Sequence, residues 1–149
     1  MIKKKIRVFI DYAHTPDAIT KVLSSLKKIT SGKLILVFGC GGDRDKLKRN
    51  QMTREALKYS DIIIITDDNP RFEDPRKIRD DMIRNLKSED LKKIKVIGNR
   101  ETAIKKGVNF LSEQDVLLIA GKGHENYQLI ENKKIFFSDK ITAKAYLKK

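Results

Sequence analysis

Residues 62–71 read Ile62-Ile63-Ile64-Ile65-Thr66-Asp67-Asp68-Asn69-Pro70-Arg71, and this stretch indicates both the fold class and the place of a site. Four consecutive β-branched residues bounded by polar ones predict a short strand buried on both faces, as in a parallel sheet. Ligands of such sheets bind beyond the carboxyl ends of the strands. The side-chain carboxylate, amide and guanidinium groups after Ile65 could therefore bind a small molecule that carries both a positive and a negative charge. They could equally form an ordinary solvated turn.

Outward from this stretch, apolar strands alternate with amphipathic helices. Helix starts are marked by Thr15-Pro16, Asp74-Pro75, Asn99 and Ser138, since these residue types cap helices or occupy the first helical position. The alternation predicts an α/β fold that is Rossmann-like, with a mostly parallel sheet, helices on both faces and a C-terminal antiparallel hairpin. We expect one domain over residues 1–149. The predicted strands are 6–10, 34–38, 62–65, 95–97 and 116–119, the predicted helices are about 16–29, 48–59, 75–86, 100–111 and from 139, and the hairpin strands are 127–130 and 134–137.

Composition limits the classes of partner. The net charge of +13, from 33 Lys+Arg against 20 Asp+Glu, could reflect a basic RNA-binding α/β domain. The basic residues are scattered, however, with no RGG tract and no aromatic platform motif, so we expect an anionic small molecule and no nucleic acid. No apolar run is long enough to cross a bilayer, and we expect no membrane partner. The single cysteine, Cys40, is typical of a reducing cytoplasm, where we expect the protein to act as a monomer.

Four loops that follow predicted strands carry polar or glycine residues, namely 11–16, 39–45, 67–71 and 121–125. In a parallel sheet all four meet at one edge, which makes that edge the candidate site. The glycines of 39–42 could cradle an anion with backbone N–H groups, or they could simply allow a tight turn. Neither this loop nor Gly121-Lys122-Gly123 has the spacing of a Walker A loop.

Several side chains in these loops are candidate ligand contacts. Arg44 and Arg71 could each form a bidentate pair with a carboxylate or phosphate of a ligand, or they could form ion pairs on the protein surface. Glu125 could accept an ammonium, or cap the next turn. His14 and His124 could contact a substrate, although structural hydrogen bonds are an equally simple role. No Ser/His/Asp set and no metal-ligand cluster is visible, so we predict no catalytic residue and no metal ligand within the chain.

Taken together, five segments resemble the C-terminal domain of the Mur ligases, the enzymes that build the peptidoglycan stem peptide. The resemblance covers nearly the whole chain, and four of the segments are motifs that occur in the order and approximate spacing of the family. At Asn69 and Arg71 the sequence resembles the family members that add diaminopimelate more than those that add lysine. The matching segments are Asp11–Asp17, Val37–Lys46, Thr66–Arg71, Ala120–Glu125 and Phe137–Lys140.

The resemblance implies an ATP-dependent amide ligase. In this family ATP phosphorylates the D-glutamate carboxylate of UDP-MurNAc-L-Ala-D-Glu, and the amine of meso-diaminopimelate then attacks the acyl phosphate. The C-terminal domain brings in the amino acid and closes over ATP. Asp11 and His14 are implied to face the nucleotide. The residues implied to bind meso-diaminopimelate are Arg44, Asp68, Asn69, Arg71, Gly121 and Glu125.

Two parts of the family pattern are missing from the sequence, the N-terminal UDP-binding domain and the central ATPase domain. ATP and Mg²⁺ are bound mainly by that central domain in the family. We therefore expect this chain to fold alone, to bind diaminopimelate weakly and to be inactive as a ligase in isolation. A stand-alone, non-catalytic module that binds a nucleotide or amino acid is the alternative reading.

Overall fold

The computed structural model describes residues 6–149; residues 1–5, which belong to the predicted domain, lie outside the described residues. Five strands form one parallel sheet in the order β1-β5-β2-β3-β4. The fifth strand in the chain thus lies between the first two and pairs with both. The strands are β1 (Arg7–Asp11), β2 (Leu34–Phe38), β3 (Ile62–Ile65), β4 (Ile94–Val96) and β5 (Val116–Ala120).

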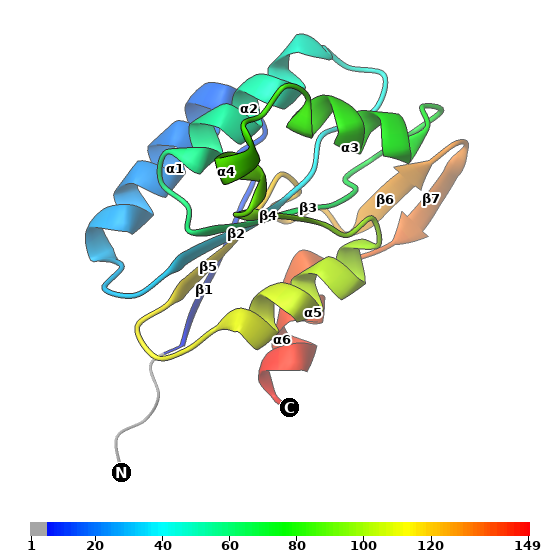
Figure 1. Ribbon diagram of the computed structural model, residues 1–149. Coiled ribbons are helices and arrows are strands. Elements are labelled where there is room, and N and C mark those ends of the chain that lie inside the picture. The colour runs from blue at the N-terminus through cyan, green and yellow to red at the C-terminus, as the bar shows by residue number, and fades with distance from the viewer. Residues whose placement is uncertain (1–5) are drawn as a thin grey trace.

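Helices cover both faces of this sheet, as the alternation predicts (Figure 1). Helices α1 (Pro16–Ile29), α2 (Leu47–Leu57) and α3 (Pro75–Ile83) pack on one face, and α5 (Arg100–Phe110) and α6 (Asp139–Leu147) pack on the other. Successive side chains of a strand point to opposite faces of the sheet. In β2, Leu36 therefore packs on the side of α1, α2 and α3, whereas Ile35 and Val37 pack on the side of α5 and α6. A four-residue helix, α4 (Ser88–Leu91), precedes β4.

The helix starts predicted from the sequence are confirmed by side-chain caps. Each capping oxygen accepts a hydrogen bond from a backbone N–H of the first turn, which typically stabilises a helix by about 1 kcal/mol. The four caps are Thr15 to Ala18 N at 3.2 Å, Asp74 to Arg76 N at 2.9 Å, Asn99 to Thr102 N at 2.9 Å, and Ser138 to Ile141 N at 3.2 Å.

A separate two-stranded antiparallel sheet, the predicted hairpin, consists of β6 (Tyr127–Ile130) and β7 (Lys133–Phe136). The sequence predicts a hairpin loop of three residues, 131–133, and this length is wrong by one residue. Lys133 pairs with Ile130, which leaves a two-residue turn. Glu131 has a φ of 53° there. The loop after β3 lies against β6, where Arg71 forms a parallel bridge with Ile130.

Other element boundaries also differ from the expectation. Strand β1 extends to Asp11, which pairs with Ala120. Helix α3 ends at Ile83, short of the predicted Leu86, and α4 follows where no helix is predicted. The last residue of α1, Ile29, is apolar but 48% exposed, because it lies in the last turn beyond the sheet contact.

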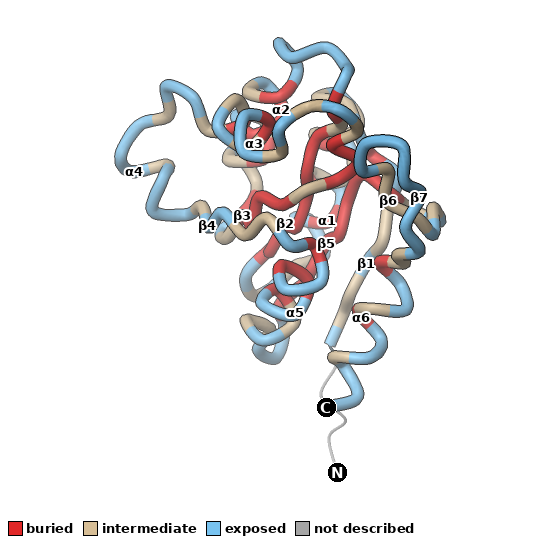
Figure 2. The backbone as a smooth tube through the Cα atoms, turned by 90° about the vertical axis from the view of Figure 1, so that its right-hand side faces the viewer, coloured by how far each residue is buried: buried red, intermediate tan, exposed pale blue. Residues whose placement is uncertain are grey.

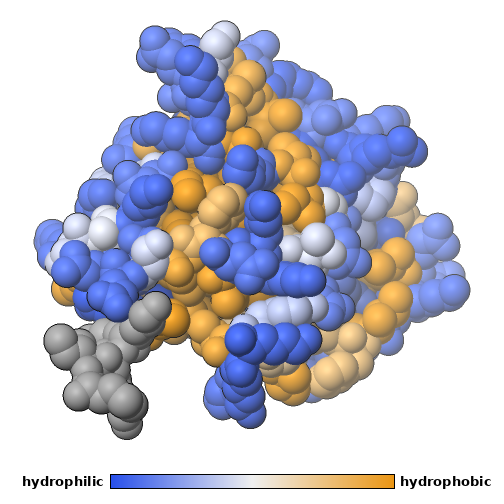
Figure 3. Space-filling model, turned by 60° about the horizontal axis from the view of Figure 1, so that its bottom comes forward, coloured by the Kyte–Doolittle hydropathy of each residue, from blue (hydrophilic) through white to orange (hydrophobic). Residues whose placement is uncertain are grey.

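Burial is concentrated along β2, β3 and β5, whereas α4 and the outer strand of the hairpin are exposed (Figure 2). The underside of the molecule shows apolar atoms bordered by hydrophilic side chains (Figure 3). Exposed Ile141 and Leu147 lie on α6, away from the residues that line the cavity described below. Among residues 6–149, no helix has the length and apolar character needed to cross a bilayer.

Candidate functional site

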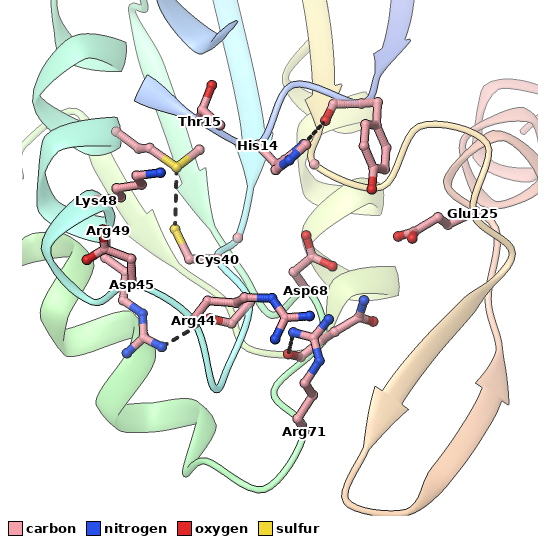
Figure 4. Close-up of a pocket in the computed structure, with 16 residues that line it drawn as sticks. His14, Thr15, Cys40, Arg44, Asp45, Lys48, Arg49, Asp68, Arg71 and Glu125 are labelled. Carbon is pink, nitrogen blue, oxygen red and sulfur yellow. Dashed lines mark hydrogen bonds between the residues drawn. The ribbon is translucent and has the colours of Figure 1, made fainter. Parts of the chain in front are cut away.

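Loops from four parallel strands meet around one cavity of about 380 Å³ at the carboxyl edge of the sheet (Figure 4). Its walls come from the loops after β1, β2, β3 and β5 and from the first turns of α2. Of the eight ligand contacts implied by the family resemblance, seven line this cavity and Asp11 does not; the further candidate His124 does not line it either. The lining residues are Tyr12, His14, Thr15, Gly39, Cys40, Gly41, Arg44, Asp45, Lys48, Arg49, Met52, Asp68, Asn69, Arg71, Gly121 and Glu125.

The loop after β3 is held in place by the hairpin. Arg71 has a φ of 53°, in the left-handed region, and its backbone N–H donates to Leu129 O at 2.9 Å while its carbonyl accepts from Glu131 N at 2.7 Å. These two bonds form the parallel bridge between Arg71 and Ile130 of β6, and they fix the backbone from which the Arg71 side chain leaves. The guanidinium Nη1 donates to Gly42 O at 2.9 Å, so it also spans the gap to the loop after β2.

The loops after β2 and β3 are in direct contact through Gly42. Its N–H donates to Asn69 O at 2.8 Å. A Cβ built on Gly42 would overlap the Pro70 carbonyl, so only glycine permits this approach. The close approach keeps Arg44, two residues further on, beside the loop that carries Arg71.

A buried arginine of α2 supports the loop after β2 from behind. The guanidinium of Arg49 donates to Glu73 at 2.8 and 2.7 Å, to Asp81 at 3.0 Å and to Gly41 O at 3.0 Å. Glu73 also accepts from Asp43 N at 3.1 Å. The hydrogen bonds from Arg49 lower the pKa of Glu73 to about 2, so this carboxylate is ionised at neutral pH. The exposed side chain of Arg44 thus projects from a loop that is fixed at two points.

Two carboxylates that line the cavity, Asp68 and Glu125, share a buried lysine. The Nζ of Lys122 lies 3.2 Å from Asp68 Oδ1 and 3.7 Å from Glu125 Oε1, and it donates to Asn69 Oδ1 at 2.9 Å. Tyr127 donates to Glu125 Oε2 at 3.2 Å, and this bond raises the pKa of the Tyr127 phenol. Acidic and amide groups therefore line the same cavity as the two arginines.

Cys40 lines the cavity but is not a nucleophile there. Its Sγ contacts Met52 Sδ at 3.8 Å. Burial raises the pKa of the Cys40 thiol to about 12, with the Asp68 carboxylate adding to the effect and Arg49 opposing it. The thiol is therefore protonated at neutral pH and fills space between the glycines.

The two residues predicted to face a nucleotide are placed differently. His14 lines the cavity, and its Nδ1 donates to Tyr12 O at 2.9 Å, which leaves Nε2 as the ring nitrogen available to a ligand. Asp11 is not among the lining residues. Its Oδ1 accepts from Ala13 N at 2.8 Å and its carbonyl accepts from Gly121 N at 3.1 Å, so it closes the turn after β1 against the turn after β5.

The residues present do not by themselves fit a magnesium–nucleotide complex. In the described part of the chain no group of three or more His, Cys, Asp or Glu side chains is arranged to hold a metal ion. Neither glycine loop has the Walker A pattern that cradles phosphates. The chemistry that these residues support is recognition of a ligand that carries both a carboxylate and an ammonium.

Sequence reasoning missed Arg49 and Lys122 as parts of the site. Both residue types are usually exposed, so a position on a helix or in a loop suggests a solvated side chain. For Lys122 the flanking glycines were the available signal, because two glycines allow a turn tight enough to direct the side chain inward. For Arg49 nothing in the local sequence marks burial.

Comparisons with known proteins agree with the resemblance. A family model described as "Mur ligase, glutamate ligase domain" matches residues 1–123. The UDP-N-acetylmuramoyl-L-alanyl-D-glutamate–2,6-diaminopimelate ligase of Rickettsia typhi is 52% identical over 142 residues, which cover 94% of this chain and 28% of that protein. A solved structure of a ligase of the same name has a TM-score of 0.91 at 41% identity and covers 99% of this chain and 30% of that one.

A more distant solved structure shows the same fold. It is a bifunctional folylpolyglutamate synthase/dihydrofolate synthase with Mn, AMPPNP and L-glutamate bound, with a TM-score of 0.61 at 20% identity over 80% of this chain and 27% of that one. The chain thus spans less than a third of the length of each of these proteins.

Proposed function

The chain belongs to the Mur ligase family, and on that basis we propose that its cavity binds the amino acid used by an ATP-dependent amide ligase. The proposed ligase adds meso-diaminopimelate to UDP-MurNAc-L-Ala-D-Glu in peptidoglycan biosynthesis; the printed names of its relatives, which join 2,6-diaminopimelate to UDP-N-acetylmuramoyl-L-alanyl-D-glutamate, support this proposal. A single buried thiol, Cys40, suits the reducing cytoplasm in which we place this reaction.

The observation that carries the proposal is that groups of both charges line one cavity. Arg44 and Arg71 lie there together with Asp68 and Glu125 (Figure 4). Its volume of about 380 Å³ is within the range of small-molecule sites. A molecule with a carboxylate and an ammonium at one end can pair with both the arginines and the carboxylates, whereas a simple anion or cation can pair with only one of the two kinds of group.

Each polar group has a proposed role in binding meso-diaminopimelate. The guanidinium groups of Arg44 and Arg71 bind the distal carboxylate, because a planar fork of N–H donors matches its two oxygens. Glu125 binds the distal ammonium together with a backbone carbonyl at Gly121. Asn69 contributes its amide N–H groups, since its Oδ1 already accepts from Lys122 and Leu129 N.

The described residues orient the incoming amino acid and leave phosphoryl transfer to other residues. We propose that ATP and Mg²⁺ are held mainly by residues outside 6–149, because the cavity lacks a phosphate loop and a metal-ligand cluster. His14 Nε2 and the turn closed by Asp11 lie at the cavity edge nearest β1, where we place the nucleotide. We expect no ATP turnover by this chain alone with diaminopimelate and the UDP-linked substrate present; robust turnover would refute this division of labour.

The amino-acid assignment is tested by titrating the ¹⁵N-labelled chain with three ligands and following backbone amide shifts. These ligands are meso-diaminopimelate, L-lysine, which lacks the distal carboxylate, and 2-aminopimelate, which lacks the distal ammonium. We expect weak binding of the first, weaker binding of the other two, and shifts confined to the loops around the cavity. Equal affinities for all three, or shifts elsewhere, would contradict the assignment, and salt-sensitive binding of RNA in a parallel titration would favour the basic RNA-binding alternative.

Matched arginine variants sharpen the test. Arg71→Ala and Arg44→Ala should each weaken binding of meso-diaminopimelate roughly tenfold while leaving L-lysine binding nearly unchanged, because lysine has no distal carboxylate. Arg76→Ala is the control, since Arg76 is exposed on α3, away from the cavity, and its loss changes the net charge by the same amount. If Arg71→Ala left the preference over lysine intact, the assignment of diaminopimelate would fail.

A further inference from the structure

Lys122 is a buried cation that lies behind the wall of the cavity and does not line it. Its side chain is fully buried. Gly121 and Gly123 on either side have φ values of 109° and 55°, which glycine adopts readily. The tight turn directs the lysine side chain inward, beneath the residues that face the ligand.

The ammonium of Lys122 is placed among three side chains that line the cavity. Its Nζ lies 2.9 Å from Asn69 Oδ1, 3.2 Å from Asp68 Oδ1 and 3.7 Å from Glu125 Oε1, with the Tyr127 ring centroid at 5.6 Å. Burying a charge is unfavourable unless it is paired and hydrogen-bonded, and here these groups supply the pairing. The lysine thus links the loop after β3 with the loop after β5.

One consequence is the orientation of the Asn69 amide. Its Oδ1 accepts from Lys122 Nζ at 2.9 Å and from Leu129 N at 3.0 Å, and both partners are donors. Because only the oxygen can accept, the amide nitrogen is turned away from Lys122 and remains available as a donor. Asn69 therefore offers N–H groups to a ligand carboxylate.

A second consequence is the charge balance around the cavity. Asp68 and Glu125 would offset Arg44 and Arg71 on their own, and Lys122 adds one more positive charge behind the two carboxylates. At neutral pH meso-diaminopimelate has no net charge, whereas L-lysine carries a net positive charge. Of the other charged residues that line the cavity, Asp45 offsets Lys48, and Arg49 is paired with Glu73 and Asp81. The buried ammonium of Lys122 therefore disfavours the cationic ligand through a short-range interaction in a poorly hydrated region.

We propose that Lys122 is a positioning residue that makes the site prefer a zwitterionic side-chain terminus over a cationic one. It acts by orienting the Asn69 side chain so that the amide N–H groups face the ligand. It also neutralises part of the negative charge of Asp68 and Glu125. This inference rests on the proposed function for its ligands, but its effect on Asn69 is measurable without any ligand.

The test compares the wild-type chain with Lys122→Met and Lys122→Gln in the same NMR titrations. For Lys122→Met we expect the ratio of the lysine Kd to the meso-diaminopimelate Kd to fall at least tenfold, equivalent to about 1.4 kcal/mol. Lys122→Gln keeps an N–H donor for Asn69 but removes the charge. It should retain the Asn69 side-chain amide signals of the wild type, yet show weaker discrimination between the two ligands.

A control separates selectivity from lost stability. Ile104→Ala removes a buried side chain of α5 on the other face of the sheet and should destabilise the fold without changing the ratio of affinities. If Lys122→Met raised the Kd of both ligands by the same factor, or if neither Lys122 variant folded, Lys122 would be a structural residue only. Either result would overturn the proposal.

The free chain supplies a readout that does not depend on ligand binding. In Lys122→Met the side-chain amide signals of Asn69 should shift and broaden, because one of the two donors to Oδ1 is lost. Unchanged Asn69 signals would refute the positioning role. Failure of the wild-type chain to bind meso-diaminopimelate would instead count against the proposed function, so the two outcomes are distinguishable.

Discussion

Replacing Glu73 by glutamine should lower the free energy of unfolding at pH 7, and the loss should shrink as the solution is acidified. In the folded protein the Glu73 carboxylate accepts two hydrogen bonds from the buried guanidinium of Arg49 and one from Asp43 N. Glutamine has a similar shape but no charge. Its side chain has one acceptor oxygen where the carboxylate has two, so the variant loses the charge and one of the bonds from Arg49, while the guanidinium keeps its bonds to Asp81 and Gly41.

The size of the effect follows from the pKa of Glu73, which Arg49 lowers from 4.5 to about 2. At about 1.4 kcal/mol per unit of pKa this corresponds to at most about 3 kcal/mol. Solvent reaches the rim of the pair and screens it, so we expect about 1–2 kcal/mol. Since the folded pKa is lowered, the contribution is complete above about pH 5 and is lost as the pH falls toward 2. Roughly two fifths of it should remain at pH 3.

The measurement is urea unfolding of both proteins between pH 3 and pH 8, followed by circular dichroism of the helices. Glu113→Gln is the matched control, because Glu113 is an exposed glutamate and its replacement should change stability little at any pH. A stability difference between wild type and Glu73→Gln that is the same at pH 3 and pH 7, or absent at pH 7, would refute the reasoning.

Three further predictions concern single contacts or single buried groups. Gly42→Ala should destabilise the fold by roughly 2 kcal/mol or more in urea unfolding, because its Cβ would overlap the Pro70 carbonyl; a neutral effect would show that the two loops can separate. Cys40 should be inert to a thiol reagent at pH 8 in the native protein and reactive in urea, since burial raises its pKa to about 12; rapid native labelling would contradict this. Arg100→Met should cost about 3–5 kcal/mol, because it leaves buried Asp139 without its paired cation, while Arg100→Met with Asp139→Leu should recover much of that loss.

The fold was predictable where its signals are local. Strands β2 and β3 have the predicted boundaries because continuous aliphatic runs, bounded by polar residues, have few alternatives. The helix starts were predictable because capping involves residues three apart or fewer. Asp11 was assigned to a loop because it is polar, yet it pairs with Ala120 in the sheet, and that pairing depends on a strand about 110 residues away.

The site was predictable in part for the same reason. Placing Arg44, Asp68 and Glu125 around one cavity required only that the strands be parallel. The burial of Arg49 and Lys122 depends instead on partners from other elements, such as Glu73 for the first and Asn69 for the second. Sequence patterns describe the face of one helix or strand, and they contain no record of which distant side chain will neutralise a charge.

The strand order has a consequence for how the protein is made. Because β5 lies between β1 and β2, a nascent chain that ends before Val116 offers Arg7–Asp11 no partner in this sheet. The loop that carries Glu125 emerges from the ribosome later still. The binding cavity is therefore completed only after residues 121–125 have been synthesised, well after the loops that follow β1, β2 and β3.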